Sequence, residues 1–258
     1  MDDTQYAISH VHARGLRRDL FRMLEDRARQ GVPAFEKSWE VLRWPYGSPR
    51  EVKGVFDRAR KALRACAFNP FGNDTRIDGL LLVPRARRHA DGQLEPVIEA
   101  RTASIAIKRG IPTGKKYTIG TVSHHAVERM FQRMNTTSKE DVLQDMLAFS
   151  IWARLLQTVA IVADSGKRIE QIPLPTPHGI FLCVRETDTW EVHMRTWIPH
   201  GMSSRHDASV ACVVAFCQGI RGDGDAHRLI AEFDAMADRP ENRWWRTPHR
   251  DAERCPYA

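Results

Sequence analysis

The sequence predicts an α+β protein in which two helices pack on a small antiparallel sheet. Three observations lead to this fold class. Residues 117–134 have the pattern of a short strand, a helix cap and an amphipathic helix, residues 179–199 alternate as two strands joined by a turn, and the first 68 residues contain two basic helices. We therefore expect a basic N-terminal α+β lobe at residues 1–116, a core at residues 117–206 and a helical C-terminal extension at residues 207–258.

Composition favours a protein with a polyanionic partner. The formal charge is +7 and the isoelectric point is near 9.4. The basic excess lies in the first 117 residues, and no apolar run reaches the roughly 20 residues that span a bilayer. The polar, acidic N-terminus does not resemble a signal peptide, so we expect a cytoplasmic protein without a membrane partner. Scattered cysteines without a CxxC pair predict reduced thiols: Cys66, Cys183, Cys212, Cys217 and Cys255.

Two helices are predicted in the N-terminal lobe, each with a basic side. The first covers Val11–Gln30 and ends at Gly31-Val-Pro33, and the second covers Glu51–Phe68. Their basic sides could follow a nucleic-acid backbone, or they are ordinary solvated faces of a small helical lobe.

Strands are predicted after the second helix. Gly79–Pro84 and Leu94–Arg101 form a hairpin, Ser104–Lys108 is a third short strand, and Gly110–Lys116 breaks the pattern as a boundary or hinge. The hairpin tip is cationic and is either a phosphate-binding loop or a solubility device; it carries Arg85, Arg87, Arg88 and His89.

The helix after Ser123 is the centre of the sequence. Ser123 is suited to cap it, and Val127, Met130, Phe131 and Met134 form an apolar stripe. A second set recurs every four residues and therefore shares another face of the helix: His125, Arg129 and Arg133. An imidazole and two guanidinium groups in a row suit an anion such as phosphate, although a solvated polar face has the same spacing.

The elements that follow are a second helix, an edge strand and two further helices. Thr137 and Glu140 predict a capping box for a helix at Ser138–Ala160, and prolines make Ile169–Leu174 an edge strand at best. Helices are also predicted at Ala208–Cys217 and Ala226–Ala237. The tail carries Trp244-Trp245 between arginines, which either stacks on bases or, as we favour, anchors the tail to its own domain.

The strand Trp190–Pro199 alternates in an informative way. Strict alternation places Glu191, His193 and Arg195 on one face, about 6.6 Å apart, a span that fits a scissile phosphate and its neighbours. The alternative is a wet outer sheet face with cross-strand pairs.

The pattern His125-Ala-x-x-Arg129-Met-x-x-Arg133, followed by Ser138-Lys-Glu-Asp-Val142, resembles a small bacterial domain family of unknown function. That family is grouped with the barnase, EndoU, colicin and RelE-like nuclease toxins, and the resemblance covers about residues 118–200. Its members end in a hairpin near a T-x-x-x-P strand, for which this chain has the shorter Thr196-Trp-Ile-Pro199.

The resemblance implies a RelE/barnase-like core and metal-independent RNA cleavage without a cofactor. It also suggests two partners, RNA and a neutralising antitoxin or immunity protein. Only His125, Arg129 and Arg133 match the family motif. With the strand residues added, we predict His125 and His193 as acid–base groups, Glu191 as the alternative base, and Arg129, Arg133 and Arg195 on phosphate. Further substrate contacts are expected from Arg85, Arg87, Arg88 and Arg185.

Other kinds of site have weaker support. Neither HExxH nor paired cysteines occur, so no metal site is predicted, and a GxSxG elbow is missing from the sequence. The main alternatives are a non-catalytic nucleic-acid- or protein-binding module and a regulatory protein of a phage or mobile element.

Overall fold

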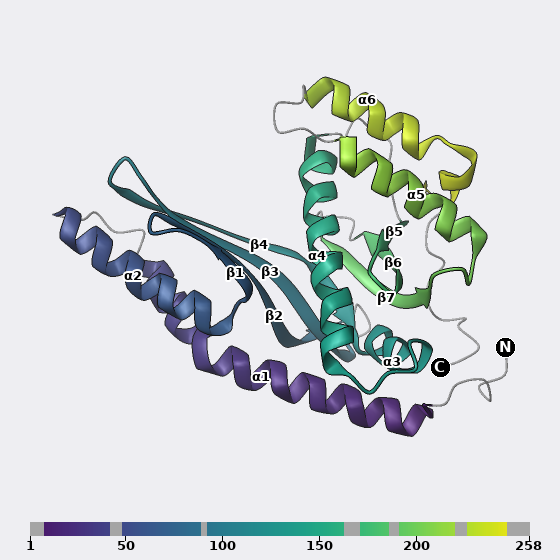
Figure 1. Cartoon of the computed structure of the whole chain (residues 1–258), viewed down its shortest axis with the longest axis horizontal. Coiled ribbons are helices and arrows are strands. Elements are labelled where there is room, and N and C mark those ends of the chain that lie inside the picture. Colours follow the sequence, from purple (N-terminus) through teal and green to yellow (C-terminus); the bar gives the residue numbers. More distant parts are fainter. Residues whose placement is uncertain are drawn as a thin grey trace. The chain divides into compact units, whose positions relative to one another are not determined.

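The computed structural model describes residues 8–41, 48–88, 92–162, 171–185, 191–219 and 226–246. The fold is α+β with a mostly antiparallel sheet, which confirms the predicted class (Figure 1). The chain divides into two compact units. The N-terminal unit is Arg14–Gly120, and the C-terminal unit combines Met1–Ala13 with Thr121–Ala258.

The first helix of the chain is longer than predicted. Helix α1 covers His10–Val41 and includes Pro33, so the expected stop at Gly31-Val-Pro33 is wrong. Beyond Pro33, the Phe35 side chain is fully buried, and its packing outweighs the backbone hydrogen bond that the proline removes. Helix α2 covers Pro49–Cys66, close to its prediction, with Ser48 as N-cap.

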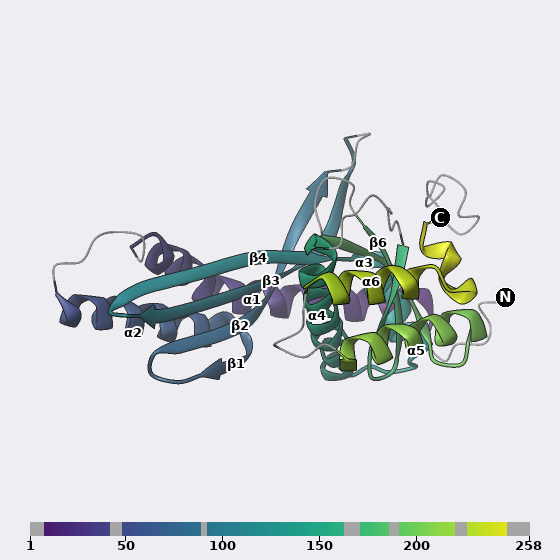
Figure 2. The same ribbon diagram turned by 90° about the horizontal axis from the view of Figure 1, so that it is seen from above.

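The strands of the N-terminal unit form an antiparallel meander. Strands β1 (Phe68–Gly72), β2 (Arg76–Arg88), β3 (Leu94–Lys108) and β4 (Ile111–Ser123) follow one another in the sheet, as Figure 2 shows. The predicted hairpin is confirmed, but its strands are longer and pair from Arg76↔Ala106 to Arg88↔Leu94. Arg85, Arg87 and Arg88, which were expected at the tip, therefore lie within strand β2.

Two predictions after the hairpin are wrong. The expected third strand is the end of β3, and the expected break at Gly110–Lys116 is the start of β4. A two-residue turn at Arg109 and Gly110 joins these strands, with φ of 51° and 76°. Positive φ at both central residues matches the right-handed twist of a hairpin, so the turn continues the sheet.

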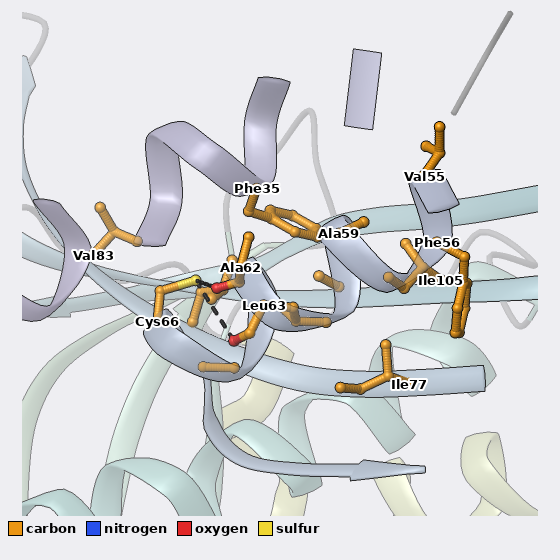
Figure 3. Close-up of a cluster of buried hydrophobic side chains, with 13 residues drawn as sticks. Phe35, Val55, Phe56, Ala59, Ala62, Leu63, Cys66, Ile77, Val83 and Ile105 are labelled. Carbon is orange, nitrogen blue, oxygen red and sulfur yellow. Dashed lines mark hydrogen bonds between the residues drawn. The ribbon is translucent and has the colours of Figure 1, made fainter. Parts of the chain in front are cut away.

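An apolar cluster between α2, α1 and the sheet forms the core of the N-terminal unit (Figure 3). Phe35 of α1 and Phe56 of α2 are fully buried, together with Ile77 and Ile105 of the strands. Close packing of α1 on α2 depends on Gly31, because a Cβ there would lie 2.7 Å from the Cys66 Cβ.

The C-terminal unit places helices around a second group of strands. Its helices are α3 (His124–Arg133), α4 (Lys139–Val162), α5 (Ser204–Gly219), α6 (Ala226–Ala237) and the short 3-10 helix η2 (Pro240–Arg246). Its strands are β5 (Gln171–Pro175), β6 (Gly179–Arg185) and β7 (Val192–Pro199), in the order β7-β6-β5, with the end of β4 beside β7. The predicted β6–β7 hairpin, the edge strand and α6 are confirmed.

Helices α4 and α5 cover opposite faces of these strands (Figure 1). Phe149 of α4 meets Phe181 of β6 edge-on, with ring centroids 5.6 Å apart. The adjacent Ile180 instead packs with Val210 of α5. Because successive strand residues point to opposite faces, this hairpin is covered on both sides.

Local details test several further expectations. The N-cap of α4 is Ser138, whose Oγ accepts from the Asp141 amide, so Thr137 is not the capping residue. Trp244 and Trp245 are buried, which confirms that they anchor the tail.

The four described cysteines are buried free thiols, as predicted, and Cys255 lies outside the described residues. Within the described ranges, no helix is both long and apolar enough to cross a membrane.

Two glycines of α1 give a matched test of this packing. Nothing lies within 4 Å of a Cβ built on Gly15, so Gly15→Ala should raise the free energy of unfolding by about 0.5–1 kcal/mol through helix propensity. Gly31→Ala should lower it by about 1–3 kcal/mol because the new methyl group overlaps Cys66. Urea unfolding of the full chain measures both, and stabilisation by Gly31→Ala would contradict the close approach of α1 and α2.

Candidate active site

The start of α3 is fixed to strand β7 by one hydroxyl group. Ser123 Oγ accepts a hydrogen bond from the Ala126 amide at 3.0 Å, which confirms the predicted cap. The same hydroxyl donates to the Arg195 carbonyl at 3.2 Å. The helix packs along β7, so its first turn has a defined position on the strand.

The predicted two faces of α3 are present. Val127, Met130 and Phe131 are fully buried. His125, Arg129 and Arg133 are all half-buried rather than fully exposed. A plain solvated helix face would expose long arginine side chains, so this row is partly enclosed by the fold.

His125 and Arg129 are in direct contact. Arg129 Nε donates to His125 Nε2 at 3.4 Å, and Arg129 Nη1 donates to Gln132 Oε1 at 3.4 Å. The pKa of His125 is lowered, first by burial and then by the positive charge of Arg129. The geometry therefore holds a neutral imidazole with its Nε2 lone pair directed at a guanidinium group.

Arg133, the third member of the row, has a structural contact. Its Nη1 donates to the Trp197 carbonyl of β7 at 2.6 Å. A charge-assisted hydrogen bond of this length ties the last turn of α3 to the end of the strand. Arg133 therefore contributes to the alignment of α3 on β7 as well as to the local positive charge.

His193 lies on β7 next to the end of β4. It is buried, and its Nδ1 is 2.6 Å from Thr121 Oγ1. Glu191 and Arg195 are half-buried. Thr121 of β4 contacts His193 of β7, and Ser123 of β4 contacts Arg195 of β7. Residue numbers therefore increase in the same direction along these parts of the two strands. Among the described residues, no hydrogen bond joins His125 to His193.

The predicted alternation along β7 is wrong beyond Arg195. Leu182 pairs with Thr196 and Cys183 pairs with Met194, so Arg195 is an extra residue without a partner on β6. Such a β-bulge shifts the side-chain alternation by one position. His193 consequently faces the Leu182 side of the hairpin, whereas Trp197 faces the Phe181 side.

The predicted substrate arginines lie in separate parts of the chain. Arg85, Arg87 and Arg88 end strand β2 of the N-terminal unit, where Arg85 Nε is 3.8 Å from Glu99. Arg185 ends β6 and pairs with Val192, but its side chain is outside the described part. His89 also lies outside the described residues.

Sequence reasoning missed a polar cluster centred on Asp145 of α4. The carboxylate is fully buried and accepts four hydrogen bonds. Oδ2 accepts from Thr176 Oγ1 at 2.7 Å and from Trp197 Nε1 at 2.9 Å. Oδ1 accepts from the His178 amide at 3.2 Å and from His178 Nδ1 at 2.8 Å. These bonds join α4 to β7 and to the turn between β5 and β6.

The Asp145 cluster compensates a buried charge and orients an imidazole. Four donors, one of them a histidine ring, offset the cost of burying a carboxylate. His178 remains 41% exposed, with Nε2 on the ring edge opposite Asp145. The sequence does contain one signal of this cluster: Asp145 is an acid within an otherwise core-like stretch of the helix. A buried acid needs donors from elsewhere in the fold.

Metal ligands do not gather in the described ranges: no three His, Cys, Asp or Glu side chains there are placed to hold a metal ion.

Arg129 gives a direct test of the His125 environment. Arg129→Met removes a positive charge and a donor to Nε2, both of which favour neutral imidazole, so the pKa of His125 should rise towards its ordinary value. Nuclear magnetic resonance titration of the His125 ring measures this change. Arg228→Gln, which removes an exposed arginine paired with Glu232, should leave the titration unchanged. An unchanged or lower pKa in Arg129→Met would show that Arg129 does not act on His125.

The comparisons with known proteins give no family for this chain: no protein-family description, curated protein or solved structure matches it.

Proposed function

We propose that the C-terminal unit is a metal-independent endoribonuclease domain, related to nuclease toxins, that cleaves RNA by general acid–base catalysis. The observation that carries this proposal is the contact between His125 and Arg129 on the half-buried face of α3. It combines a base whose pKa is lowered with a guanidinium group that can hold a phosphate.

The reaction needs a base, an acid and positive charge at phosphorus. His125 Nε2 takes the proton of the ribose 2′-hydroxyl, and the 2′-oxygen forms a bond to phosphorus. The bond from phosphorus to the 5′-oxygen breaks, and the acid protonates that oxygen, which leaves a 2′,3′-cyclic phosphate and a 5′-hydroxyl group. In the free protein Arg129 donates to Nε2, so a bound phosphate would draw this guanidinium away and release the lone pair.

We assign the remaining roles to residues on or beside β7. We assign the acid to His193, whose ring is held through Nδ1 by Thr121, so that proton transfer would use Nε2. Glu191, directly before β7, is the alternative base. Arg195 at the bulge is a second phosphate ligand, and Arg133 supports the site by aligning α3.

We also propose that α3, α4 and β5–β7 form a RelE/barnase-like core. In support, α3 packs on β7, and α4 packs on β5. A neutralising antitoxin or immunity protein belongs to this proposal as a partner.

Adjacent histidines provide the variant and its control. His125→Gln should reduce RNA cleavage in the presence of EDTA by about 10²–10⁴-fold, the usual contribution of a positioned acid–base group. His124→Gln changes the neighbouring half-buried imidazole, which lies about 100° away around the helix, and should retain most activity. Gel analysis of labelled RNA measures both rates, with circular dichroism to confirm folding. Equal activity of both variants, or no cleavage by wild-type protein on varied RNAs, would contradict the proposal.

The second candidate is a non-catalytic nucleic-acid-binding module. The specific observation in its favour is the exposed basic face of α2 in the N-terminal unit. Expression separates the two functions: a ribonuclease should poison its host in a manner that His125→Gln relieves, whereas a binding module should be tolerated in both forms.

A further inference from the structure

Helix α2 has one apolar and one cationic side. Its apolar side is buried in the core of the N-terminal unit, including Val55, Phe56 and Leu63. The other side lies along the outside of this unit (Figures 1 and 2). Five basic residues of the helix are exposed, and they are Arg50, Lys53, Arg58, Lys61 and Arg64.

The acids of the described residues do not pair with these five side chains. The acid in the middle of the helix, Asp57, is 3.4 Å from Arg60, which also binds Asp74 at 2.7 Å. In the part of the chain that the structure describes, none of the five exposed cations has an acidic partner within 4.0 Å.

Helix α1 carries both paired and unpaired exposed cations. Its exposed Arg22 lies 4.0 Å from Asp19, and its exposed Arg29 lies 3.4 Å from Glu25 and 3.8 Å from Asp26. Other exposed cations of α1 resemble those of α2: Arg14, Arg18 and Lys37 have no acidic partner within 4.0 Å among the described residues.

The cations of α2 form a row with a defined length. At 100° per residue, Arg50, Lys53, Lys61 and Arg64 fall within an arc of about 80°. At 1.5 Å per residue the row is about 21 Å long, over which one strand of a nucleic-acid helix presents about six phosphates. Phe56, the one aromatic residue in the α2 sequence, is buried, so this face offers no platform for stacking on bases.

The two units also differ in charge. Residues 14–120 contain 23 basic and 12 acidic residues, a formal charge of +11, whereas the rest of the chain contains 16 basic and 20 acidic residues, a formal charge of −4. The net charge of the N-terminal unit therefore attracts a polyanion, whereas the net charge of the unit that carries His125 does not.

We infer that the outer face of α2 is a binding site for the phosphate backbone of RNA, used independently of base sequence. The choice of RNA as occupant rests on the proposed ribonuclease function. The cations supply the salt-dependent part of the affinity, and His125 on α3 supplies none of it.

The test uses the full-length protein and a fluorescent 2′-O-methyl RNA, which lacks the hydroxyl nucleophile and cannot be cleaved by the proposed reaction. The triple variant Lys53→Gln, Lys61→Gln, Arg64→Gln removes three unpaired charges. Its control, Arg22→Gln, Arg29→Gln, Arg228→Gln, removes the same charge from three exposed arginines that are already paired. Fluorescence anisotropy from 50 to 300 mM salt gives Kd and its salt dependence.

We expect the α2 variant to weaken binding about 10–100-fold at 0.1 M salt and to reduce the slope of log Kd against log salt by about 2, since each single-strand phosphate contact contributes about 0.7. The control should stay within about twofold of wild type. Equal weakening in both variants would show a net-charge effect and overturn the site, as would wild-type protein that does not bind this RNA. Loss of phosphatidylserine-vesicle binding in the α2 variant, without loss of RNA binding, would assign the face to a membrane and overturn the inference.

Failure of this site and failure of the proposed function give different results. Cleavage that depends on His125 with unchanged RNA affinity in the α2 variant would overturn only the binding site. Binding that depends on α2 without any cleavage would overturn only the catalytic proposal.

Discussion

Trp197 is the residue on which the arrangement of the C-terminal unit depends. Its carbonyl accepts from Arg133 of α3, and its indole donates to the buried carboxylate of Asp145 on α4. Asp145 in turn holds the turn between β5 and β6 through Thr176 and His178. One buried residue of β7 therefore holds α3 through its backbone carbonyl and α4 through its indole, and Asp145 extends the network to the turn.

This arrangement explains why the polar row of α3 differs from an ordinary surface. Ser123 fixes the start of the helix and Arg133 fixes its end, both on backbone carbonyl groups of β7. His125 and Arg129 between them are half-buried and in direct contact. Enclosure lowers the pKa of His125, and the same enclosure would strengthen the interaction of Arg129 with an anion.

Local patterns predicted the elements of this fold better than its contacts. The Ser123 cap, the β6–β7 hairpin and helix α6 follow from short-range periodicity, and the structure contains them. Helix α1 continues through Pro33 because Phe35 packs in a core that is assembled from distant residues. The bulge at Arg195 and the four donors on Asp145 likewise depend on partners far along the chain, so spacing within one segment could not predict them.

The end groups of the RNA fragments test most directly whether the 2′-hydroxyl is the nucleophile. Purified protein is incubated with an RNA oligonucleotide in EDTA, and the products are analysed by mass spectrometry. The proposed mechanism predicts fragments with 2′,3′-cyclic phosphate and 5′-hydroxyl ends, and no cleavage after a 2′-deoxy nucleotide. Fragments with 5′-phosphate ends, or cleavage after the deoxy position, would contradict it.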